Sequence, residues 1–501
     1  MDEQTQQPKL HAELLNALQS WAEGSTGSEL WLDEERIAHS CTDWRKRYRT
    51  HALAVVLPKT TQQLREVVKL CAHHKVAICT QGGNTGLVGG AVPTAPGAGG
   101  LRGENADRPH VLLVTRKLRD TLEVDLSNLT LSISAGYTLQ EAQEEAEKHG
   151  LLFPLSLASE GTCTIGGNLA SNAGGVAVLR YGNTRELCLS LEYVNAQGQI
   201  CGDLRGLRKN NTGYDLRHLM IGSEGTLGLI TRACLKLYPA PTAKVVVWMN
   251  VKSIHTAVAL LGRIQSRLYN ELSSYEWMNA HAIDLVCKHF QLKAPMDIKD
   301  SGCEHVLAEF TALGSQQALE EKVVEFFEEL FASGVDDALG LLALFVAQSL
   351  SENDAFWALR ENISEAQAKE GLNVKHDIAC AVSALPSFHD AALAELQALD
   401  LGVRPVLFGH LGDGNLHFNV SGPAGEDSKN FLAAHQDSLN EIVHRHIMLV
   451  GGTVSAEHGI GQLKAELLQE ITAPPNYQAF QAIKRALDPD NLLNPGKLIL
   501  L

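Results

Sequence analysis

The sequence lacks several features that would assign it to a common class of protein. No C-x-x-C pair occurs among its ten cysteines, so neither a disulfide framework nor a cysteine–zinc site is expected. The longest markedly apolar run, LGLLALFVA at 339–347, is far shorter than the roughly 20 residues needed to cross a bilayer. The chain begins with neither a basic-then-apolar signal segment nor an Arg/Ser-rich transit segment. We therefore expect a cytoplasmic protein with reduced thiols.

Positive charge is also scarce. Lys and Arg number 42 against 58 Asp and Glu, which gives a formal net charge of −16. A nucleic-acid partner held by phosphate contacts is therefore not expected, whereas a small anion can still bind in a local basic pocket. Hydrophobic residues make up 45% of the 501 positions and charged residues 20%, which is typical of a folded, enzyme-like chain of two or three domains.

Glycine is in modest excess, with 43 residues, and gathers in three segments. The first, QGGNTGLVGG at 81–90, is neither a Walker loop nor a G-x-G-x-x-G fingerprint. Its backbone N–H groups can turn inward around a phosphate, although a plain tight loop is the alternative. Segments 159–175 and 208–231 repeat the mixture of Gly, Ser, Thr and Asn. Three such cradles suit a long ligand with a pyrophosphate and a ring at each end.

Hydrophobic periodicity predicts an α+β first domain. The expected elements are a helix from Thr60, strands at 76–80, 111–115 and 129–136, and a helix at about 138–149. A Pro/Gly-rich stretch at 93–110 is expected to form a surface loop. Pro239 and Pro241 separate two β-rich runs and mark a domain boundary. Beyond them, to about residue 450, amphipathic helices alternate with strands, which predicts an antiparallel sheet covered by helices.

The stretch FGHLGDGNLHFNV at 408–420 places two histidines symmetrically about Asp413–Gly414. Asp-Gly between apolar flanks is a strong hairpin signal, because both central residues of a type I′ turn need positive φ. In such a hairpin His410 and His417 are cross-strand partners with Cβ atoms roughly 4.5–5.5 Å apart, close enough to bind one metal ion. The alternative is a surface hairpin whose histidines only form hydrogen bonds.

Glu457 and His458 lie side by side between small residues in GGTVSAEHGIGQLK. On a strand they would point to opposite faces, so we expect different roles for them. With His410 and His417, Glu457 would complete a two-histidine, one-carboxylate set that suits Zn²⁺ or a similar divalent ion and leaves positions open for a substrate. The alternative is a solvated acid beside a solvated histidine.

The segment 351–371 is expected to be one helix, with Ser351 and Asp354 as its N-terminal box. Arg360 and Ser364 would then lie four residues apart on one face. The alternative for Arg360 is an exposed side chain on an amphipathic helix.

The motifs QGGNTGLVGG, IGGNLASNAGG, NTGYDLRHLMIGSEGTLG, GHLGDGNLH and SAEHGIG, in this order, resemble those of the FAD-linked oxidases of the vanillyl-alcohol-oxidase-like fold. Within them the D-2-hydroxy-acid dehydrogenases are most similar, from about residue 40 to the end. The resemblance implies an α+β protein in which an FAD-binding domain of the PCMH type carries an inserted antiparallel-sheet cap domain. The expected division is 1–240 for the first part of the FAD domain, 241–450 for the cap with the metal site, and 451–501 for the return to the FAD domain.

The resemblance implies FAD as cofactor. The first glycine loop contains no His, Cys or Tyr, so we expect non-covalent FAD, with attachment at Cys163 as the alternative. The residues that the resemblance assigns to FAD are Gly82, Gly83, Asn84, Thr85, Gly86, Leu87, Gly161, Thr162, Gly166, Gly167, Ser171, Asn172, Gly225, Ile230 and Asn494.

The resemblance also assigns the remaining functional residues. The metal ligands are His410, His417 and Glu457, and His458 is the base that removes the hydroxyl proton as hydride leaves for flavin N5. The substrate contacts are Arg360, Ser364, Lys375 and Asn419. Ser364 stands where the family has Thr, and the loop ACAVSALP lacks the earlier proline of the family pattern, which bears on the substrate preference.

The expected reaction is oxidation of a D-2-hydroxy acid to the 2-oxo acid, with D-2-hydroxyglutarate as the expected substrate and D-lactate or glycolate as alternatives. An electron-transfer flavoprotein or a quinone would accept the electrons, and a quinone would bring the protein to the inner-membrane surface. A homodimer is among the expected assemblies. A non-catalytic regulator that binds zinc and a nucleotide is the alternative from another class, but it has no need for His458 or for the Arg360/Lys375 pair.

Overall fold

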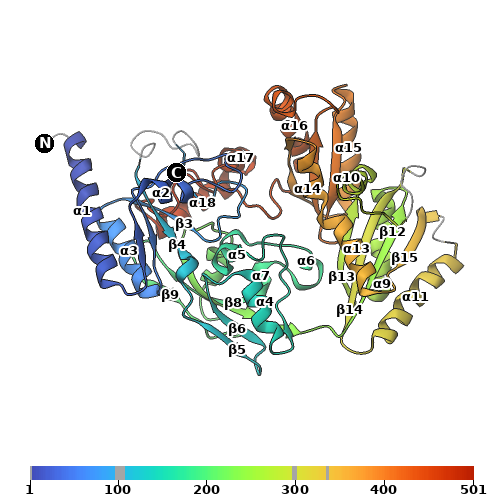
Figure 1. Cartoon of the computed structure of the whole chain (residues 1–501), viewed down its shortest axis with the longest axis horizontal. Coiled ribbons are helices and arrows are strands. Elements are labelled where there is room, and N and C mark those ends of the chain that lie inside the picture. The colour runs from blue at the N-terminus through green and yellow to red at the C-terminus, as the bar shows by residue number, and fades with distance from the viewer. Residues whose placement is uncertain (1–2, 96–107, 296–301, 335–337) are drawn as a thin grey trace. The chain divides into compact units, whose positions relative to one another are not determined.

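The computed structural model describes residues 3–95, 108–295, 302–334 and 338–501. Its contacts divide the chain into two compact units, coloured by residue number in Figure 1. The first unit comprises Met1–Gly174, Asn183–Tyr238 and Glu457–Leu501, and the second comprises Gly175–Gly182 and Pro239–Ala456. Each unit is therefore built from segments that are far apart in the sequence.

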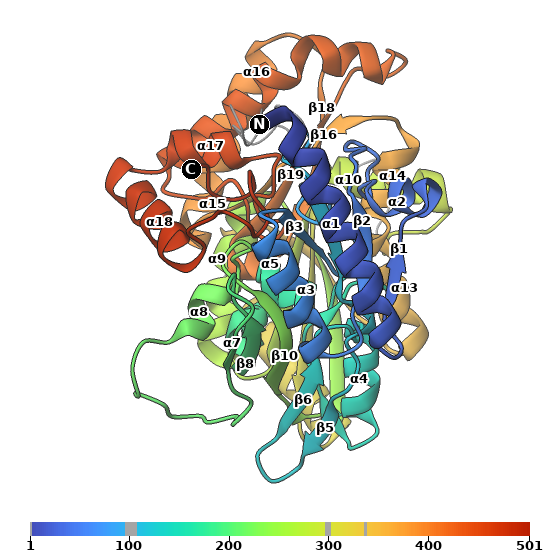
Figure 2. The same ribbon diagram turned by 90° about the vertical axis from the view of Figure 1, so that its left-hand side faces the viewer.

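A four-stranded sheet lies in the first unit, in the order β1-β2-β4-β3. Its strands are β1 (Glu29–Trp31), β2 (Ala54–Leu57), β4 (His110–Val114) and β3 (Ala77–Gln81). Strands β2, β4 and β3 are parallel. Helix α3 (Thr61–His73) begins after Thr60, whose side chain caps it, and α1 (Glu3–Gly24) packs along α3 (Figure 2). Apolar side chains of both helices, including Leu18 and Leu64, bury this sheet. The helix and strands expected here are confirmed.

A five-stranded antiparallel sheet completes the first unit, in the order β5-β6-β10-β8-β9. Its strands are β5 (Leu122–Asp125), β6 (Thr130–Ser134), β10 (Leu229–Lys236), β8 (Cys188–Val194) and β9 (Ile200–Gly202). Helix α4 (Leu139–Glu147) begins with a capping box between Thr138 and Glu141, and α5 (Ile165–Ser171) packs on β10. The strand and helix expected after residue 129 are confirmed.

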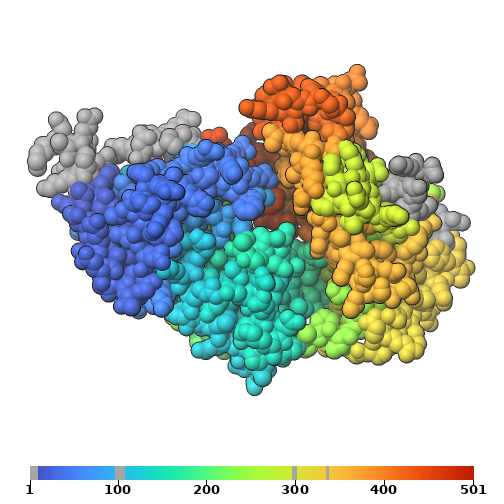
Figure 3. Space-filling view, viewed as in Figure 1, coloured from blue at the N-terminus to red at the C-terminus, as the bar shows by residue number. Residues whose placement is uncertain are grey.

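The second unit is a single large sheet covered by helices, as the sequence predicts. The strand order is β15-β12-β14-β13-β18-β19-β16, with β17 also paired to β19, and every pairing is antiparallel. The strands are β12 (Ala243–Val251), β13 (Leu272–Met278), β14 (Glu304–Ala312), β15 (Leu341–Val346), β16 (Asn373–Val374), β17 (Asp377–Ala379), β18 (Arg404–Gly409) and β19 (Asn415–Ser421). The helices that contact it include α9 (Ile254–Leu268), α10 (Ala280–Phe290), α11 (Gln316–Ala332) and α16 (Ser428–Leu449). The exposed face of α11 is visible in yellow in Figure 3.

The prediction of a single helix at 351–371 is wrong. The structure has two helices there, α13 (Leu350–Glu361) and α14 (Ile363–Lys369), which meet at Asn362. The cap is Ser349, whose hydroxyl accepts from the backbone N–H of Glu352, rather than Ser351. The two helices meet at Asn362 because its ψ of −1° departs from the helical value of about −42°.

Three further expectations concern the cysteines, the Pro/Gly-rich loop and membrane-spanning helices. All ten cysteines are free. Most of the Pro/Gly-rich loop expected at 93–110 lies outside the described residues, since these omit 96–107. In the described part of the chain, no helix combines the length and apolar character required to cross a membrane.

A buried ion pair fixes the last helix, α18 (Pro474–Leu487), to the rest of the first unit. The Lys484 ammonium donates to the Asp488 carboxylate and to the backbone carbonyls of Thr226 and Leu493, at 2.8 and 2.9 Å. Lys484 is 2% exposed and Asp488 is fully buried. Removing one charge would leave the other buried without its partner, which is costly in a low-dielectric interior.

We expect Lys484→Met to lower the free energy of unfolding by about 3 kcal/mol, as measured by denaturant unfolding. Lys484→Met combined with Asp488→Asn should recover part of this loss, because the stranded carboxylate is gone. The control is Arg485→Met, one residue along the same helix at an exposed position. A loss no larger than that of the control would contradict the prediction.

Candidate functional site

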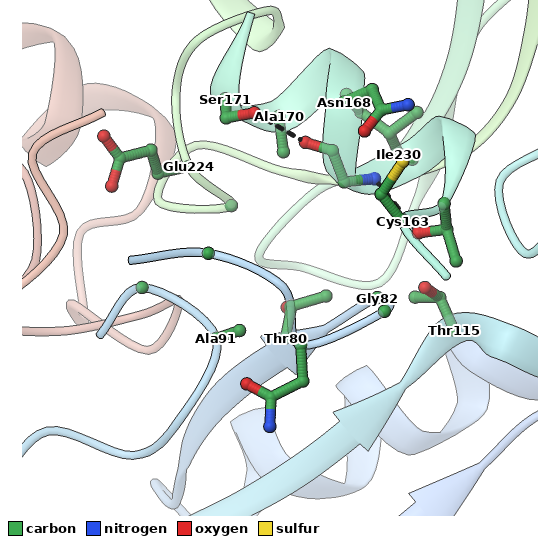
Figure 4. Close-up of a pocket in the computed structure, with 18 of the residues that line it drawn as sticks. Thr80, Gly82, Ala91, Thr115, Cys163, Asn168, Ala170, Ser171, Glu224 and Ile230 are labelled. Carbon is green, nitrogen blue, oxygen red and sulfur yellow. Dashed lines mark hydrogen bonds between the residues drawn. The ribbon is translucent and has the colours of Figure 1, made fainter. Parts of the chain in front are cut away.

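A cavity in the first unit brings the glycine-rich segments together (Figure 4). It encloses about 910 Å³ of empty space, including its open mouth. Its walls come from the loop after β3, from α5 with the residues before it, and from the turn that leads into β10. His458 and Asn494, from the C-terminal segment, complete the lining. The part of the third glycine segment before residue 222 is largely exposed and does not line the cavity.

Close backbone contact between the first two segments explains their glycines. A Cβ atom on Gly82 would lie 2.3 Å from the Thr164 hydroxyl, and one on Gly83 would lie 2.1 Å from the Thr162 carbonyl oxygen. Such distances are far below van der Waals contact, so only glycine allows the two loops to meet. Thr164 also accepts a hydrogen bond from the Gly167 N–H, which starts helix α5 beside the cavity.

Two buried polar atoms on cavity-lining residues point to a ligand. The Thr80 hydroxyl and the Asn168 side-chain nitrogen have no hydrogen-bond partner among the described residues (Figure 4 labels both residues). A buried polar group without a partner costs free energy unless a ligand or water satisfies it. A ligand with both donors and acceptors, such as the dinucleotide and flavin ring of FAD, fits these walls.

Most residues that the sequence assigns to FAD border this cavity. They are Gly82, Gly83, Asn84, Thr85, Gly86, Gly166, Gly167, Ser171, Gly225, Ile230 and Asn494. Leu87, Gly161, Thr162 and Asn172 lie outside its lining. Sequence reasoning missed Thr80, Thr115, Asn168 and Glu224. Asn168 and Glu224 lie inside the glycine motifs themselves, so the polar residues of those motifs were the signal that could have found them.

In the second unit, the prediction of a tight two-residue turn between β18 and β19 is wrong. His417 pairs with Phe408 rather than with His410. The loop contains a 3₁₀ turn at Leu411–Asp413, and only Gly414 in it has a positive φ, of 86°. The longer loop forms because the Gly414 carbonyl accepts from the Cys380 N–H beside β17. The two imidazole rings still lie near each other, with centroids 6.1 Å apart.

A buried carboxylate orients His410. Glu276 of β13 is fully buried, and its Oε1 lies 2.7 Å from Nδ1 of His410 while its Oε2 accepts from Nε of Arg360 at 2.8 Å. Burial by itself raises the pKa of Glu276, but His410 and Arg360 outweigh burial and hold the pKa at about 2. The contact at Nδ1 fixes the orientation of the His410 ring. A single charged residue inside the otherwise uncharged strand LSSYEWM was the sequence signal that could have found Glu276.

The expected substrate residues differ in their surroundings. Arg360 is buried, 9% exposed, with its guanidinium over the Phe408 ring, whereas Ser364 is exposed on α14. The structure therefore does not place these two on one face of one helix. Lys375 is exposed between β16 and β17. Asn419 is buried on β19, and its side-chain nitrogen donates to Gln367 at 2.9 Å.

Glu457 and His458 lie in an irregular bend, not on a strand, so alternation along a strand does not explain their roles. Glu457 follows Ala456, whose N–H donates to the carbonyl of Asp377. Each of His410, His417 and Glu457 offers one ligand atom, and these atoms all lie within 4.8 Å of one another. Asp377, Glu457 and His458 form a second such group, and Asp377 was not expected from the sequence.

Comparison with known proteins identifies the family. Residues 240–498 match the family "FAD linked oxidases, C-terminal domain", and residues 52–202 match "FAD binding domain". The chain is 34% identical to D-2-hydroxyglutarate dehydrogenase of Xanthomonas citri pv. viticola, over 92% of each chain. It is 32% identical to the mitochondrial D-2-hydroxyglutarate dehydrogenase of Arabidopsis thaliana, over 93% of this chain and 78% of that one. The protein belongs to the D-2-hydroxyglutarate dehydrogenase family.

Membership of the D-2-hydroxyglutarate dehydrogenase family makes the protein an FAD-dependent dehydrogenase. The fold agrees. The structure of p-cresol methylhydroxylase superposes with a TM-score of 0.70 at 15% identity, over 94% of each chain. The expected architecture, a PCMH-type FAD-binding domain with an antiparallel-sheet domain inserted in it, is confirmed.

The contact between the glycine loops makes FAD binding sensitive to a single methyl group. We expect Gly83→Ala to weaken FAD binding about 10- to 100-fold, because relieving a backbone clash of this kind costs roughly 1–3 kcal/mol. Flavin absorbance per protein after dialysis measures the loss. Gly24→Ala, where a Cβ meets nothing within 4 Å, is the control. Full retention of FAD by Gly83→Ala would contradict the proposed cause.

Proposed function

We propose that the protein oxidises D-2-hydroxyglutarate to the 2-oxo acid, with FAD and a divalent metal ion as cofactors. One observation carries the proposal: His410, His417 and Glu457 form a candidate metal-binding group, and the residue that follows Glu457, His458, lines the cavity of the FAD-binding unit. The names of the relatives support this substrate. Electrons would leave the flavin for an electron-transfer flavoprotein or a quinone.

His458 is the base in this proposal. Its imidazole borders the cavity, so it can take the proton from the 2-hydroxyl of a substrate that lies against the flavin. Bound FAD supplies the acceptor for the hydride from C2, and a divalent ion supplies the charge that makes the hydroxyl more acidic. The proposed flavin has no covalent bond to the chain, because the first glycine loop contains no His, Cys or Tyr. Cys163, the alternative attachment point, is buried, and burial raises the pKa of its thiol.

Imidazole and carboxylate ligands suit Zn²⁺ or a similar divalent ion, and a set of three leaves positions for the substrate. Glu276 supports His410: its carboxylate accepts from Nδ1 and so fixes the orientation of the ring, whose other nitrogen would hold the ion. Arg360 balances the charge of Glu276 from the other side. The buried charges of this part of the unit are therefore paired before any ligand binds.

The substrate carboxylates are assigned to Arg360, Lys375, Ser364 and Asn419. The Arg360 guanidinium has five N–H donors, of which Nε–H is engaged by Glu276. Lys375 adds a cation at an exposed position, which favours an acid with a second carboxylate at its far end. D-lactate and glycolate have only one carboxylate and would not use it.

Removal of Glu276 tests the metal site. We expect Glu276→Gln to weaken metal binding about 10- to 100-fold, because an outer carboxylate that orients a ligating histidine typically contributes this much. Zn²⁺ titration of the chelator-treated holoenzyme measures the affinity, and FAD content should stay unchanged. Glu304→Gln is the matched control, since Glu304 lies on the neighbouring strand and accepts from Trp277. Full turnover of a metal-free preparation would overturn the metal-dependent proposal.

Lys375→Met tests the substrate. We expect kcat/KM for D-2-hydroxyglutarate to fall about 10-fold or more, while the value for D-lactate changes little, because only the longer acid loses an ionic contact. Lys429→Met, an exposed lysine on α16, is the control. Equal kcat/KM values for the two acids in the unmodified protein would favour the D-lactate alternative, and an unchanged ratio in the variant would remove Lys375 from the site.

A further inference from the structure

Glu224 occupies an unusual position in the wall of the FAD cavity. It lies in the turn GSEGTLG with a φ of 51°, in the left-handed region that residues other than glycine seldom adopt. Strained backbone of this kind persists where the surrounding contacts require it, and it is enriched at functional sites. The contacts of Glu224 explain why this residue keeps the left-handed conformation.

The Glu224 backbone joins two other parts of the cavity wall. Its N–H donates to the carbonyl of Ala170 on α5 at 2.9 Å, and its carbonyl accepts from the Asn494 side chain at 2.6 Å. Asn494 in turn accepts from the N–H of Thr80 at 3.1 Å. Segments of the cavity wall that are tens to hundreds of residues apart in the sequence are thus joined at Glu224 by hydrogen bonds.

The Glu224 side chain reaches the segment that carries His458. One carboxylate oxygen accepts from the N–H of Ile460 and the other from the N–H of Gly461, both at 2.7 Å. Gly459 leaves room for this contact, since a Cβ there would lie 2.7 Å from a carboxylate oxygen. Successive N–H groups that converge on one anion define the local backbone path more tightly than a single bond does.

The first glycine loop also holds the same segment. The N–H groups of Gln462 and Leu463 donate to the carbonyl of Val88, and the Gln462 side chain donates to the carbonyl of Gly89. The bend after His458 is therefore held both by Glu224 and by the first glycine loop. Of these two contacts, only the one with Glu224 uses an ionisable side chain.

We propose that Glu224 is a positioning residue for the reaction: its carboxylate fixes Ile460 and Gly461 and so sets the place of the His458 imidazole on the cavity wall. The inference rests on the proposed role of His458 as base. Glu224 itself exchanges no proton with the substrate. Its raised pKa, which follows from burial against the lowering effect of the two N–H groups, marks the free-energy cost of keeping a carboxylate there.

The test uses Glu224→Gln in the metal-loaded holoenzyme. Glutamine keeps the shape but directs an amide NH₂ at one of the two N–H groups, so the clamp loses half its acceptors. We expect FAD and metal content to remain, KM for D-2-hydroxyglutarate to change little, and anaerobic flavin reduction per bound FAD to slow about 10- to 100-fold. The solvent deuterium isotope effect on this step should rise, because proton removal becomes slower.

A double-mutant cycle separates positioning from a structural role. His458→Asn alone should slow flavin reduction by about 10²–10⁴-fold. If Glu224 acts through His458, adding Glu224→Gln to His458→Asn should slow the reaction no further. The control is Glu192→Gln, a buried carboxylate of the same unit that pairs with Arg232 and does not line the cavity. We expect it to lower stability without changing the rate per bound FAD.

The other possible results also decide whether Glu224 positions His458. An unchanged rate per bound FAD in Glu224→Gln, with a slow His458→Asn, overturns the inference and leaves the proposed function standing. An unchanged rate in His458→Asn overturns both. If Glu224→Gln fails to fold, Gly459→Ala disturbs the same contact from its other side. A folded Gly459→Ala that reduces its flavin at the original rate, or loss of FAD from both variants, would show that Glu224 serves only the fold.

Discussion

The close contact between the loop after β3 and the segment before α5 is the constraint on which the FAD site depends. The two backbones approach until a Cβ on Gly82 or Gly83 would overlap atoms of Thr164 or Thr162. Their polar groups can then face a common space, which Thr80 and Asn168 line; each of these two residues has a buried polar atom with no partner among the described residues. The glycines therefore have two functions: they let the walls meet, and they leave the space between them open to a large ligand.

Two carboxylates support the proposed chemistry through their contacts: Glu276 is fully buried, and Glu224 is partly buried. Glu276 connects Arg360 and His410 within the second unit, and Glu224 holds the backbone after His458 in the first. A buried carboxylate is costly in isolation, and each of these is stabilised by cations or by paired N–H groups. In both cases the stabilising partners are groups that the proposed reaction needs in a defined place. The same contacts therefore stabilise the two carboxylates and position the groups of the proposed reaction.

The pairing of Arg360 with Glu276 changes how its role is understood. A cation with no partner in a buried site would discriminate strongly against any substrate that fails to neutralise it. Because Glu276 already compensates part of the charge, substrate preference at the proposed site would depend more on the exposed Lys375 and on the shape of the site. Ser364, which the sequence places on the same helical face, lies on a different helix and is exposed.

Local sequence determined much of this protein. The periodic segments define α3, β3, β4, β6 and α4, and the long motifs define the family, the fold and most of the cavity lining, because these depend on neighbouring residues and on glycines with few alternatives. Tertiary structure decided the rest. Asp-Gly favours a tight turn, but pairing of β19 with β17 and the bond from Cys380 to Gly414 select a longer loop and a different register for His410. Glu276 meets His410 across 134 residues, and Glu224 meets Ile460 across 236. No local pattern encodes such partners, because which buried charges face each other is set only when distant strands and loops pack together.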